Sequence, residues 1–228
     1  MEPYDGHTFL GLEPIEKDVD IVVLPLPYEL TTSYGTGTSE GPKACIEASM
    51  QVELYDTNLK EDLPAGLTIH TAKAWNGEEP TLLHQLDSMV GYLTPWFTGD
   101  CFPLTLGGEH GILPPLMEAV RNHPLVHNDL SNLTVVQIDA HGDLRSELDD
   151  EPYSHACAAA RALDAGVGRL LQVGIRAFSK EEHERMLSDN RVTTFFAQET
   201  QSPYQGASHW QAWLDILDQI EGPVHLTL

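Results

Sequence analysis

Short apolar segments alternate with longer amphipathic segments along most of this chain. The apolar segments have the length of β-strands and are nearly continuous, which is typical of strands buried on both faces of a parallel sheet. The pattern predicts strands at residues 20–26, 102–106, 133–138, 169–175, 192–196 and 224–228. The segments between them predict helices at about residues 41–49, 80–97, 111–122, 155–165, 180–189 and 209–220.

The order of these elements predicts the fold class. Strand, loop and helix repeated along the chain is the βαβ pattern of an α/β protein, with a mainly parallel central sheet covered by helices on both sides. No internal repeat, low-complexity tract or linker divides the sequence, so we expect a single domain over residues 1–228. Parallel sheets bind ligands at the carboxyl ends of their strands. Polar residues that directly follow a strand are therefore the first candidates for chemistry.

The composition restricts the partners. The chain has 228 residues with 12 Lys and Arg against 35 Asp and Glu, a formal net charge of −23. Such a field repels nucleic acid and anionic membranes and favours a cationic substrate or partner. A solvated acidic surface that serves solubility is the simpler explanation, because the charge is spread along the chain.

The cysteines and the apolar segments bear on the compartment. Cys45, Cys101 and Cys157 are odd in number and widely spaced, which favours neither a disulfide framework nor a cysteine zinc site. The first residues lack the pattern of a secretory signal, and no window approaches the ~18 apolar residues of a membrane span. We expect a cytoplasmic protein without membrane or nucleic-acid partners.

The strongest chemical signal follows the predicted strand at 133–138. Asp139, His141 and Asp143 occupy alternating positions there, so their side chains point to one side if the chain stays extended. Carboxylates with imidazoles suit Mn²⁺, or less often Ni²⁺, Fe²⁺ or Zn²⁺. A loop of ordinary solvated acids is the alternative interpretation.

A second signal follows the predicted strand at 102–106. Gly107 and Gly108 allow a close backbone approach or a positive φ, and His110 then stands at the entrance to a helix. By itself this histidine is more typical of an ordinary loop residue. Two such segments after parallel strands can nevertheless converge on one site.

A third signal is His155, sixteen residues after Asp139 at the start of a predicted helix. A histidine that titrates near neutrality can shuttle protons beside a metal site. The alternative is a histidine in the first turn of a helix that Ser154 caps.

Residues 32–42 are rich in Gly, Thr and Ser and follow the first predicted strand. They lack the spacing of a nucleotide-binding loop. We expect a rigid, irregular loop that leads into a helix.

Five segments together resemble the ureohydrolase family of arginases, agmatinases and formiminoglutamases: SYGTGTSEGPKACIEAS, GGEH, DAHGDLR, YSHAC and LLQVGIR. Their order and spacing match the family along nearly the whole chain. The segments DLR and SHAC look closest to prokaryotic agmatinases. The resemblance implies a three-layer α/β/α arginase-like fold with a mainly parallel central sheet.

The resemblance also implies a site with two Mn²⁺ ions per subunit, with Ni²⁺ as an alternative. His110, Asp139 and Asp143 would bind one ion, and His141 with the bridging Asp139 would bind the second. His155 would be the catalytic histidine near the departing amine. The family is commonly a homotrimer or homohexamer, which makes the same kind of assembly an expectation for this chain.

The implied reaction is hydrolysis of a guanidino C–N bond, which releases urea. Two cations ~3.5–4 Å apart lower the pKa of a shared water toward neutrality. Agmatine, giving putrescine, is the first candidate among small cationic guanidino substrates. Guanidine, guanidino acids, arginine and formiminoglutamate are alternatives. A member of a different class, a catalytically silent relative that binds a ligand or serves as an oligomer partner, also remains open.

Two features depart from the family pattern. Its usual GGDH is replaced by a segment with Glu109, which we expect to alter the surroundings of His110 and not the ligand itself. The family's last two metal-binding aspartates should directly follow a strand such as residues 224–228, where the given sequence stops. We therefore expect the natural polypeptide to continue with such a pair, and residues 1–228 alone to be a poor dimetal enzyme.

Overall fold

The computed structural model describes residues 6–14 and 18–228. It contains two compact units, Met1–His123 and Pro124–Leu228, each with its own parallel sheet. Every strand that the sequence predicts is present with its ends shifted by at most one residue. Every predicted helix is also present: the one at 41–49 has the predicted bounds, and the ends of the others are shifted by up to four residues. The single domain stays a prediction.

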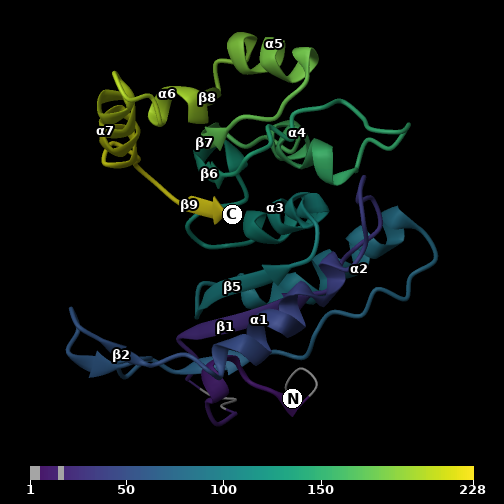
Figure 1. Ribbon diagram of the computed structural model, residues 1–228. Coiled ribbons are helices and arrows are strands. Elements are labelled where there is room, and N and C mark those ends of the chain that lie inside the picture. The colour runs from purple at the N-terminus through teal and green to yellow at the C-terminus, as the bar shows by residue number, and fades with distance from the viewer. Residues whose placement is uncertain (1–5, 15–17) are drawn as a thin grey trace. The chain divides into compact units, whose positions relative to one another are not determined.

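The first unit is built on three parallel strands in the order β4-β1-β5. They are β1 (Ile21–Leu26), β4 (Ile69–Thr71) and β5 (Phe102–Gly107), and Figure 1 shows β1 and β5 side by side. β1 pairs with β5 along its whole length, and its apolar side chains are buried. The sequence did not predict β4, because three residues with a histidine in the middle carry no apolar run.

The helices of this unit are α1 (Gly41–Ser49), α2 (Leu82–Leu93) and α3 (Leu113–Arg121). Short 3-10 turns occur at η2 (Phe9–Gly11), η3 (Thr38–Glu40), η4 (Thr94–Trp96) and η5 (His110–Ile112). The short strands β2 (Tyr55–Asp56) and β3 (Glu61–Asp62) form an antiparallel pair. α2 packs on α3, and α1 contacts β1 and β5.

The second unit is built on four parallel strands in the order β8-β7-β6-β9. They are β6 (Thr134–Ile138), β7 (Arg169–Ile175), β8 (Val192–Phe196) and β9 (Val224–Thr227). Its helices are α4 (Ala158–Asp164), α5 (Lys180–Ser188), α6 (Ala197–Thr200) and α7 (Gly206–Leu217), with 3-10 turns at η6 (Leu130–Asn132) and η7 (His155–Cys157).

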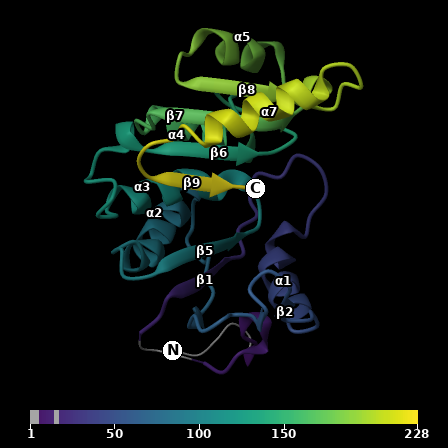
Figure 2. The ribbon, with the colours of Figure 1, turned by 90° about the vertical axis from the view of Figure 1, so that its left-hand side faces the viewer.

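Helices cover both faces of the second sheet. α7 crosses one face and α4 lies behind the sheet in Figure 2. On the α7 face, Trp213 packs against Val136, Leu171, Val173 and Phe195. Burial of these side chains favours folding by about 1.5–3 kcal/mol for each large apolar group. The opposite face carries the alternate residues of the same strands, since successive side chains of a strand point to opposite faces.

β5 and β9 differ from the expectation of strands buried on both faces. Alternate side chains are exposed on both, namely Phe102 and Leu104 on β5 and Val224 and Leu226 on β9. Each of these strands lies at the edge of its sheet. The expectation is confirmed for β1, β6 and β7, which have a neighbouring strand on each side and are buried along most of their length.

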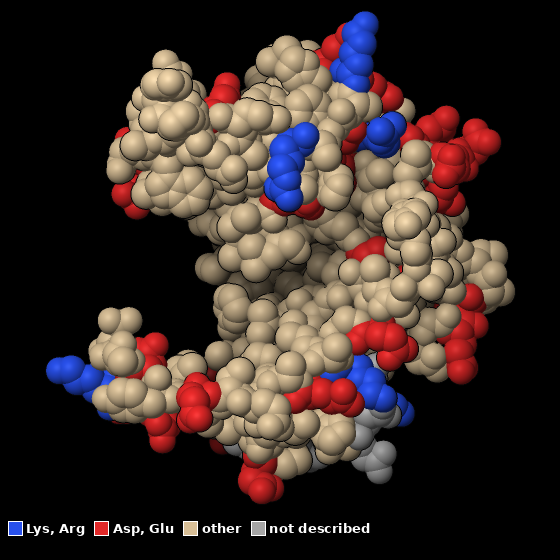
Figure 3. Space-filling view, in the orientation of Figure 1, with Lys and Arg blue, Asp and Glu red and all other residues tan. Residues whose placement is uncertain are grey.

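The surface is acidic, as the composition predicts. On the face drawn in Figure 3, Asp and Glu side chains are spread over several segments, with few Lys and Arg among them. This distribution agrees with the net charge of −23 and with the expectation that the charge is not gathered into one patch.

Candidate metal centre

The motif at residues 139–143 begins at the carboxyl end of β6 and stays attached to β7. The amide of Asp139 donates to the carbonyl of Val173 at 3.1 Å. Gly174 follows with a φ of +87°, and a Cβ at this position would lie 3.1 Å from the carbonyl oxygen of Asp139. A side chain at residue 174 would therefore be both strained and crowded, and glycine lets the two strand ends lie close together.

Both carboxylate oxygens of Asp139 accept hydrogen bonds. Oδ1 accepts from the amide of His141 at 2.9 Å, and Nδ1 of the same histidine lies 3.3 Å away. Oδ2 accepts from Nε2 of Gln137 at 3.3 Å. These contacts fix the direction of the carboxylate, whereas the side chain of His141 is largely exposed.

Asp143 has an unusual backbone for a residue that carries a side chain. Its φ is +51°, in the left-handed region that Asp tolerates better than most residues, and the residue is buried. Its carbonyl accepts from the amide of Ala160 in α4 at 3.0 Å. A buried carboxylate in this conformation needs the surrounding structure to hold it, which is common at functional sites.

The end of the loop is held by the first turn of α5. Glu182 is buried and forms a capping box with Ser179, because each side chain accepts from the other's backbone amide. The same carboxylate accepts from the amide of Leu144 at 3.2 Å and lies 3.6 Å from Nε of Arg145. One side chain therefore both starts a helix and fixes the loop.

His155 begins the turn η7, with Ser154 as its cap. The hydroxyl of Ser154 accepts from the amide of Ala156 at 3.4 Å and lies 3.4 Å from Nδ1 of His155. The cap by Ser154 that the alternative interpretation names is thus present, and the catalytic role of His155 stays a prediction. The carbonyl of Ala156 accepts from the amide of Arg145, which attaches this turn to the loop after Asp143.

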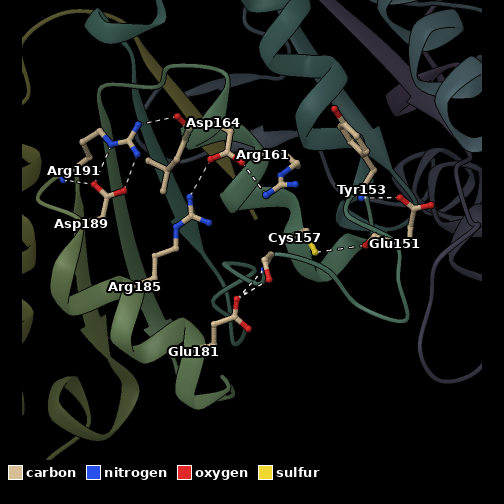
Figure 4. A network of polar contacts seen from close by, with 11 residues as sticks. Glu151, Tyr153, Cys157, Arg161, Asp164, Glu181, Arg185, Asp189 and Arg191 are labelled. Carbon is tan, nitrogen blue, oxygen red and sulfur yellow. Dashed lines mark hydrogen bonds and ion pairs between the residues drawn. The ribbon is translucent and has the colours of Figure 1, made fainter.

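A network of ion pairs and hydrogen bonds surrounds these segments (Figure 4). Asp164 of α4 accepts from Arg161 at 2.8 Å and from Arg185 of α5 at 3.2 Å. Ser146 donates to Glu181 of α5 at 2.7 Å. Exposed pairs of this kind contribute about 0–1 kcal/mol each, so their main effect here is to orient α5 beside α4 and the loop.

His110 lies in the first unit, at the carboxyl end of β5. The amide of Gly108 donates to the carbonyl of Leu26 at 3.1 Å, which continues the pairing of β5 with β1. A Cβ on Gly108 would lie 2.1 Å from the carbonyl oxygen of Tyr28, so only glycine fits there. Close approach, and not a positive φ, is therefore the reason for this glycine. His110 then begins the turn η5.

Glu109 is buried and reaches back to the loop after β1. Its carboxylate accepts from the amide of Thr31 at 2.9 and 3.1 Å and from the hydroxyl of Thr31 at 2.8 Å. The residue that departs from the family pattern therefore joins the segment of His110 to this loop.

A second carboxylate holds the same loop from within. Glu29 accepts from the amides of Gly37 and Ser39, at 2.8 to 2.9 Å, and these bonds lower its pKa to about 2. The loop then runs through η3 into α1, which has Pro42 in its first turn. The expected irregular loop is present at residues 32–37 and leads through η3 into α1, and the amides of Ser39 and Gly37 bind this chain's own carboxylate.

The second unit thus holds Asp139, His141 and Asp143 in one fixed loop, with the turn of His155 attached to it. His110, the remaining predicted ligand, belongs to the first unit. The sequence interpretation overlooked Gln137 and Glu182. Their signals were a glutamine within an apolar strand and a Ser-x-x-Glu pattern at a helix start.

Comparison with known proteins identifies the protein family. The family model of the arginase family matches residues 19–228. The chain belongs to the arginase family.

Two curated relatives show which members of the family the chain resembles in sequence. The chain is 35% identical over 199 residues to an N(1)-aminopropylagmatine ureohydrolase of a Synechocystis species, covering 84% of this chain and 62% of the relative. It is 30% identical over 190 residues to an agmatinase of Bacillus cereus, covering 80% and 61%. The chain thus spans about three fifths of the length of these curated relatives.

Solved structures show the fold. A formimidoylglutamase of Bacillus subtilis has a TM-score of 0.78 at 17% identity, covering 96% of this chain and 68% of the other. An agmatine ureohydrolase of Thermoplasma volcanium has a TM-score of 0.73 at 24% identity, covering 92% and 66%. The expected fold class is confirmed: an α/β protein of the three-layer, arginase-like type with mainly parallel strands. Within residues 6–14 and 18–228, no helix has the length and apolar character that crossing a membrane requires.

Proposed function

We propose that this protein is a metal-dependent ureohydrolase that cleaves a guanidino C–N bond and releases urea. The observation that carries the proposal is the loop of Asp139, His141 and Asp143 at the carboxyl end of β6, in a chain of the arginase family. Ligand sites of parallel α/β sheets lie at this end of the strands.

The residues fit a divalent cation. His110, Asp139 and Asp143 each offer an imidazole nitrogen or a carboxylate oxygen, a donor set that suits Mn²⁺ or Ni²⁺. We propose that His110, Asp139 and Asp143 hold one Mn²⁺ and that Asp139 and His141 hold the second.

The chain's own residues then have separate tasks. When bound, a pair of divalent cations supplies the Lewis acidity that activates a water for attack on the guanidinium carbon. Asp139 keeps one orientation because both of its oxygens accept hydrogen bonds from the loop and from β6. His155 gives a proton to the departing amine, so that urea and an amine leave as neutral or cationic products.

Agmatine is the first candidate substrate. The agmatinase of Bacillus cereus supports it, and the aminopropylagmatine ureohydrolase of the Synechocystis species supports a substrate longer by an aminopropyl group. Both are cationic, which suits an acidic protein. A release assay for urea with Mn²⁺ or Ni²⁺ tests agmatine, aminopropylagmatine, guanidine and arginine side by side, and an assay for formamide tests formiminoglutamate, whose formimino group cannot give urea. Release of no urea from any of the four guanidino compounds would contradict the proposal.

Two variants separate ligation from proton transfer. Asp139→Asn is expected to abolish urea release and to lower the metal content. His155→Ala is expected to keep the metal and to lose most of kcat, about 10²–10⁴-fold for a general acid. Metal content by elemental analysis and kcat by urea release give the two readouts. Loss of metal from the His155 variant would make this residue a ligand instead.

We further propose a cytoplasmic homo-oligomer, a trimer or hexamer, as the active form. Family membership supports the assembly. Light scattering at micromolar concentration tests it, and a monomer at all concentrations would contradict it.

A further inference from the structure

A row of polar residues crosses the apolar interior of the second unit. Gln137 of β6 pairs with Gln172 of β7, and Gln172 pairs with Thr194 of β8. Both glutamines are fully buried. An unpaired buried amide costs about 1–3 kcal/mol or more, so polar side chains at these positions need partners and a reason.

The face on which this row lies is not the face that α7 covers. Val136, Leu171 and Phe195 belong to the cluster around Trp213 on the α7 face. The row consists of the alternate residues of the same strands, which point the other way. Gln137 lies one residue before the end of β6 and two residues before Asp139, so the side chains of these two residues share a face.

In each hydrogen bond along this row, the donor lies toward Thr194 and the acceptor lies toward Asp139. The hydroxyl of Thr194 donates to Oε1 of Gln172 at 2.9 Å, and Nε2 of Gln172 donates to Oε1 of Gln137 at 2.8 Å. Nε2 of Gln137 then donates to Oδ2 of Asp139 at 3.3 Å. Reversing either amide would place two oxygens or two NH₂ groups against each other.

The second N–H of each side-chain amide also donates a hydrogen bond, in both cases to a backbone carbonyl of the loop. Nε2 of Gln172 donates to the carbonyl of Gly142 at 2.8 Å, and Nε2 of Gln137 donates to the carbonyl of His141 at 3.3 Å. The two buried amides therefore contact a carboxylate and two backbone carbonyls within the loop. Chains of hydrogen bonds polarise one another in a site of low dielectric, which strengthens the last bond of the series.

We infer that Gln137, Gln172 and Thr194 are positioning residues for the metal-binding loop. They hold one oxygen of Asp139 and the carbonyls of His141 and Gly142 before any ion arrives, so that the loop loses little entropy on binding. Thr194 touches no predicted ligand and acts through two glutamines. The inference rests on the proposed function for the identity of the ion, and on the hydrogen bonds alone for the order of the loop.

The test uses two variants that interrupt the row and two matched controls. Gln172→Leu removes both donors at nearly the same volume, and Thr194→Val removes only the hydroxyl at the start of the row. Thr194→Ser keeps that hydroxyl and should restore parent behaviour. Thr193→Val makes the same chemical change on the neighbouring residue of β8, whose side chain points to the opposite face.

The first readout is Mn²⁺ affinity, measured from the free-ion electron paramagnetic resonance signal during a titration of the whole protein with Mn²⁺ alone. Loss of a group that orients a ligand typically weakens metal binding by about 10–100-fold, which is the expectation for Gln172→Leu. Thr194→Val should lose less, about fivefold, because one neutral hydrogen bond is removed. Thr194→Ser and Thr193→Val should match the parent.

The second readout needs no metal. Amide hydrogen exchange of the chelator-treated protein reports the opening of individual segments. The amides of His141 and Leu144 should exchange faster in Gln172→Leu and Thr194→Val, while the amides of α7 keep the parent rate. Faster exchange throughout the second unit would instead show a general structural role and overturn the inference. Should Gln172→Leu fail to fold, the Thr194 pair decides the matter by itself.

The outcomes separate this inference from the proposed function. A parent protein that binds no Mn²⁺ would refute the proposed metal site, and the exchange rates would still decide whether the row orders the loop. Parent-like affinity and parent-like exchange in both Gln172→Leu and Thr194→Val would overturn the inference and leave the proposed function standing.

Discussion

At the scale of single residues, Glu109 shows how one methylene group changes the contacts beside a predicted ligand. Its carboxylate is buried and accepts three short contacts from Thr31, a residue 78 positions away in the sequence. An aspartate at this position would end short of Thr31 unless the backbone moved. The adjacent His110 is unchanged in type, so the departure affects the loop after β1 first.

Glu109→Asp is therefore expected to lower the free energy of unfolding by about 1–3 kcal/mol, since hydrogen bonds to a charged group are lost in a buried place. Urea denaturation followed by circular dichroism measures the change. The matched control is Glu118→Asp, which shortens a half-exposed glutamate on α3 and should cost less than about 0.5 kcal/mol. Equal effects of the two substitutions would contradict the role assigned to Glu109.

Two cysteines of the chain should differ in reactivity. Cys157 is buried, its thiol donates to the carbonyl of Glu151 at 3.9 Å (Figure 4), and burial raises its pKa to about 11. Cys45 on α1 is exposed. Because the thiolate is the reactive form, iodoacetamide at pH 8 should modify Cys45 in the native protein and spare Cys157. Peptide mass spectrometry measures both sites, and modification in denaturant is the control.

At the scale of elements, the loop between β1 and α1 depends on carboxylates to fix its backbone. Glu29 accepts hydrogen bonds from the amides of Gly37 and Ser39 inside the loop. Glu109, in the segment after β5, accepts a hydrogen bond from the amide of Thr31. The oriented amides of Ser39 and Gly37 favour the ionised form of Glu29. The stability of this loop is therefore linked to pH.

The sign of this dependence follows from the pKa of Glu29, which the amides of Ser39 and Gly37 lower from 4.5 to about 2. A lowered pKa stabilises the folded state above pH 4.5, and the contribution is lost as the pH falls through the range from 4.5 to 2. The difference in urea midpoint between the parent and Glu29→Gln should therefore be largest near neutrality and should shrink across this range. Glu40→Gln, an exposed position in the same segment, is the control. A difference that is constant with pH would contradict the linkage.

At the scale of the whole molecule, net charge bears on how substrate arrives and not on what holds the site together. A net charge of −23 attracts a cationic guanidine compound, and the range of this attraction becomes shorter as the salt concentration rises. The Debye length falls from ~30 Å at 0.01 M salt to ~8 Å at 0.15 M. Only exposed charges are affected over this range, so the buried carboxylates keep their contacts.

If the proposed function holds, kcat/KM for agmatine should fall about three- to tenfold between these two salt concentrations, with kcat nearly unchanged. Steady-state urea release measures both constants. If the protein also hydrolyses guanidinoacetate, which carries no net charge, its kcat/KM should not change with salt and serves as the control. Sucrose in place of salt controls for viscosity. A kcat/KM for agmatine that does not depend on salt would contradict the prediction that the acidic surface speeds the arrival of substrate.

The sequence by itself determined most of the secondary structure and the chemical character of the site. Strand and helix positions follow from apolar periodicity, which depends on near neighbours in the chain, and every predicted element is present. The motif at residues 139–143 and the glycines before His110 also stand in local sequence, so their resemblance to the ureohydrolases was enough to predict the family. The short strand β4 carried too little local signal to be predicted.

The tertiary structure decided what depends on residues far apart in the chain. The order β8-β7-β6-β9 places Gln137, Gln172 and Thr194 in one row, although up to 57 positions separate them, the difference between residues 137 and 194. The bond between Glu109 and Thr31 and the contact of Glu182 with the loop at Leu144 have the same origin. Cross-strand register and burial arise only when distant segments pair, so the ligand types could be predicted from the sequence, whereas the groups that hold those ligands in place could not.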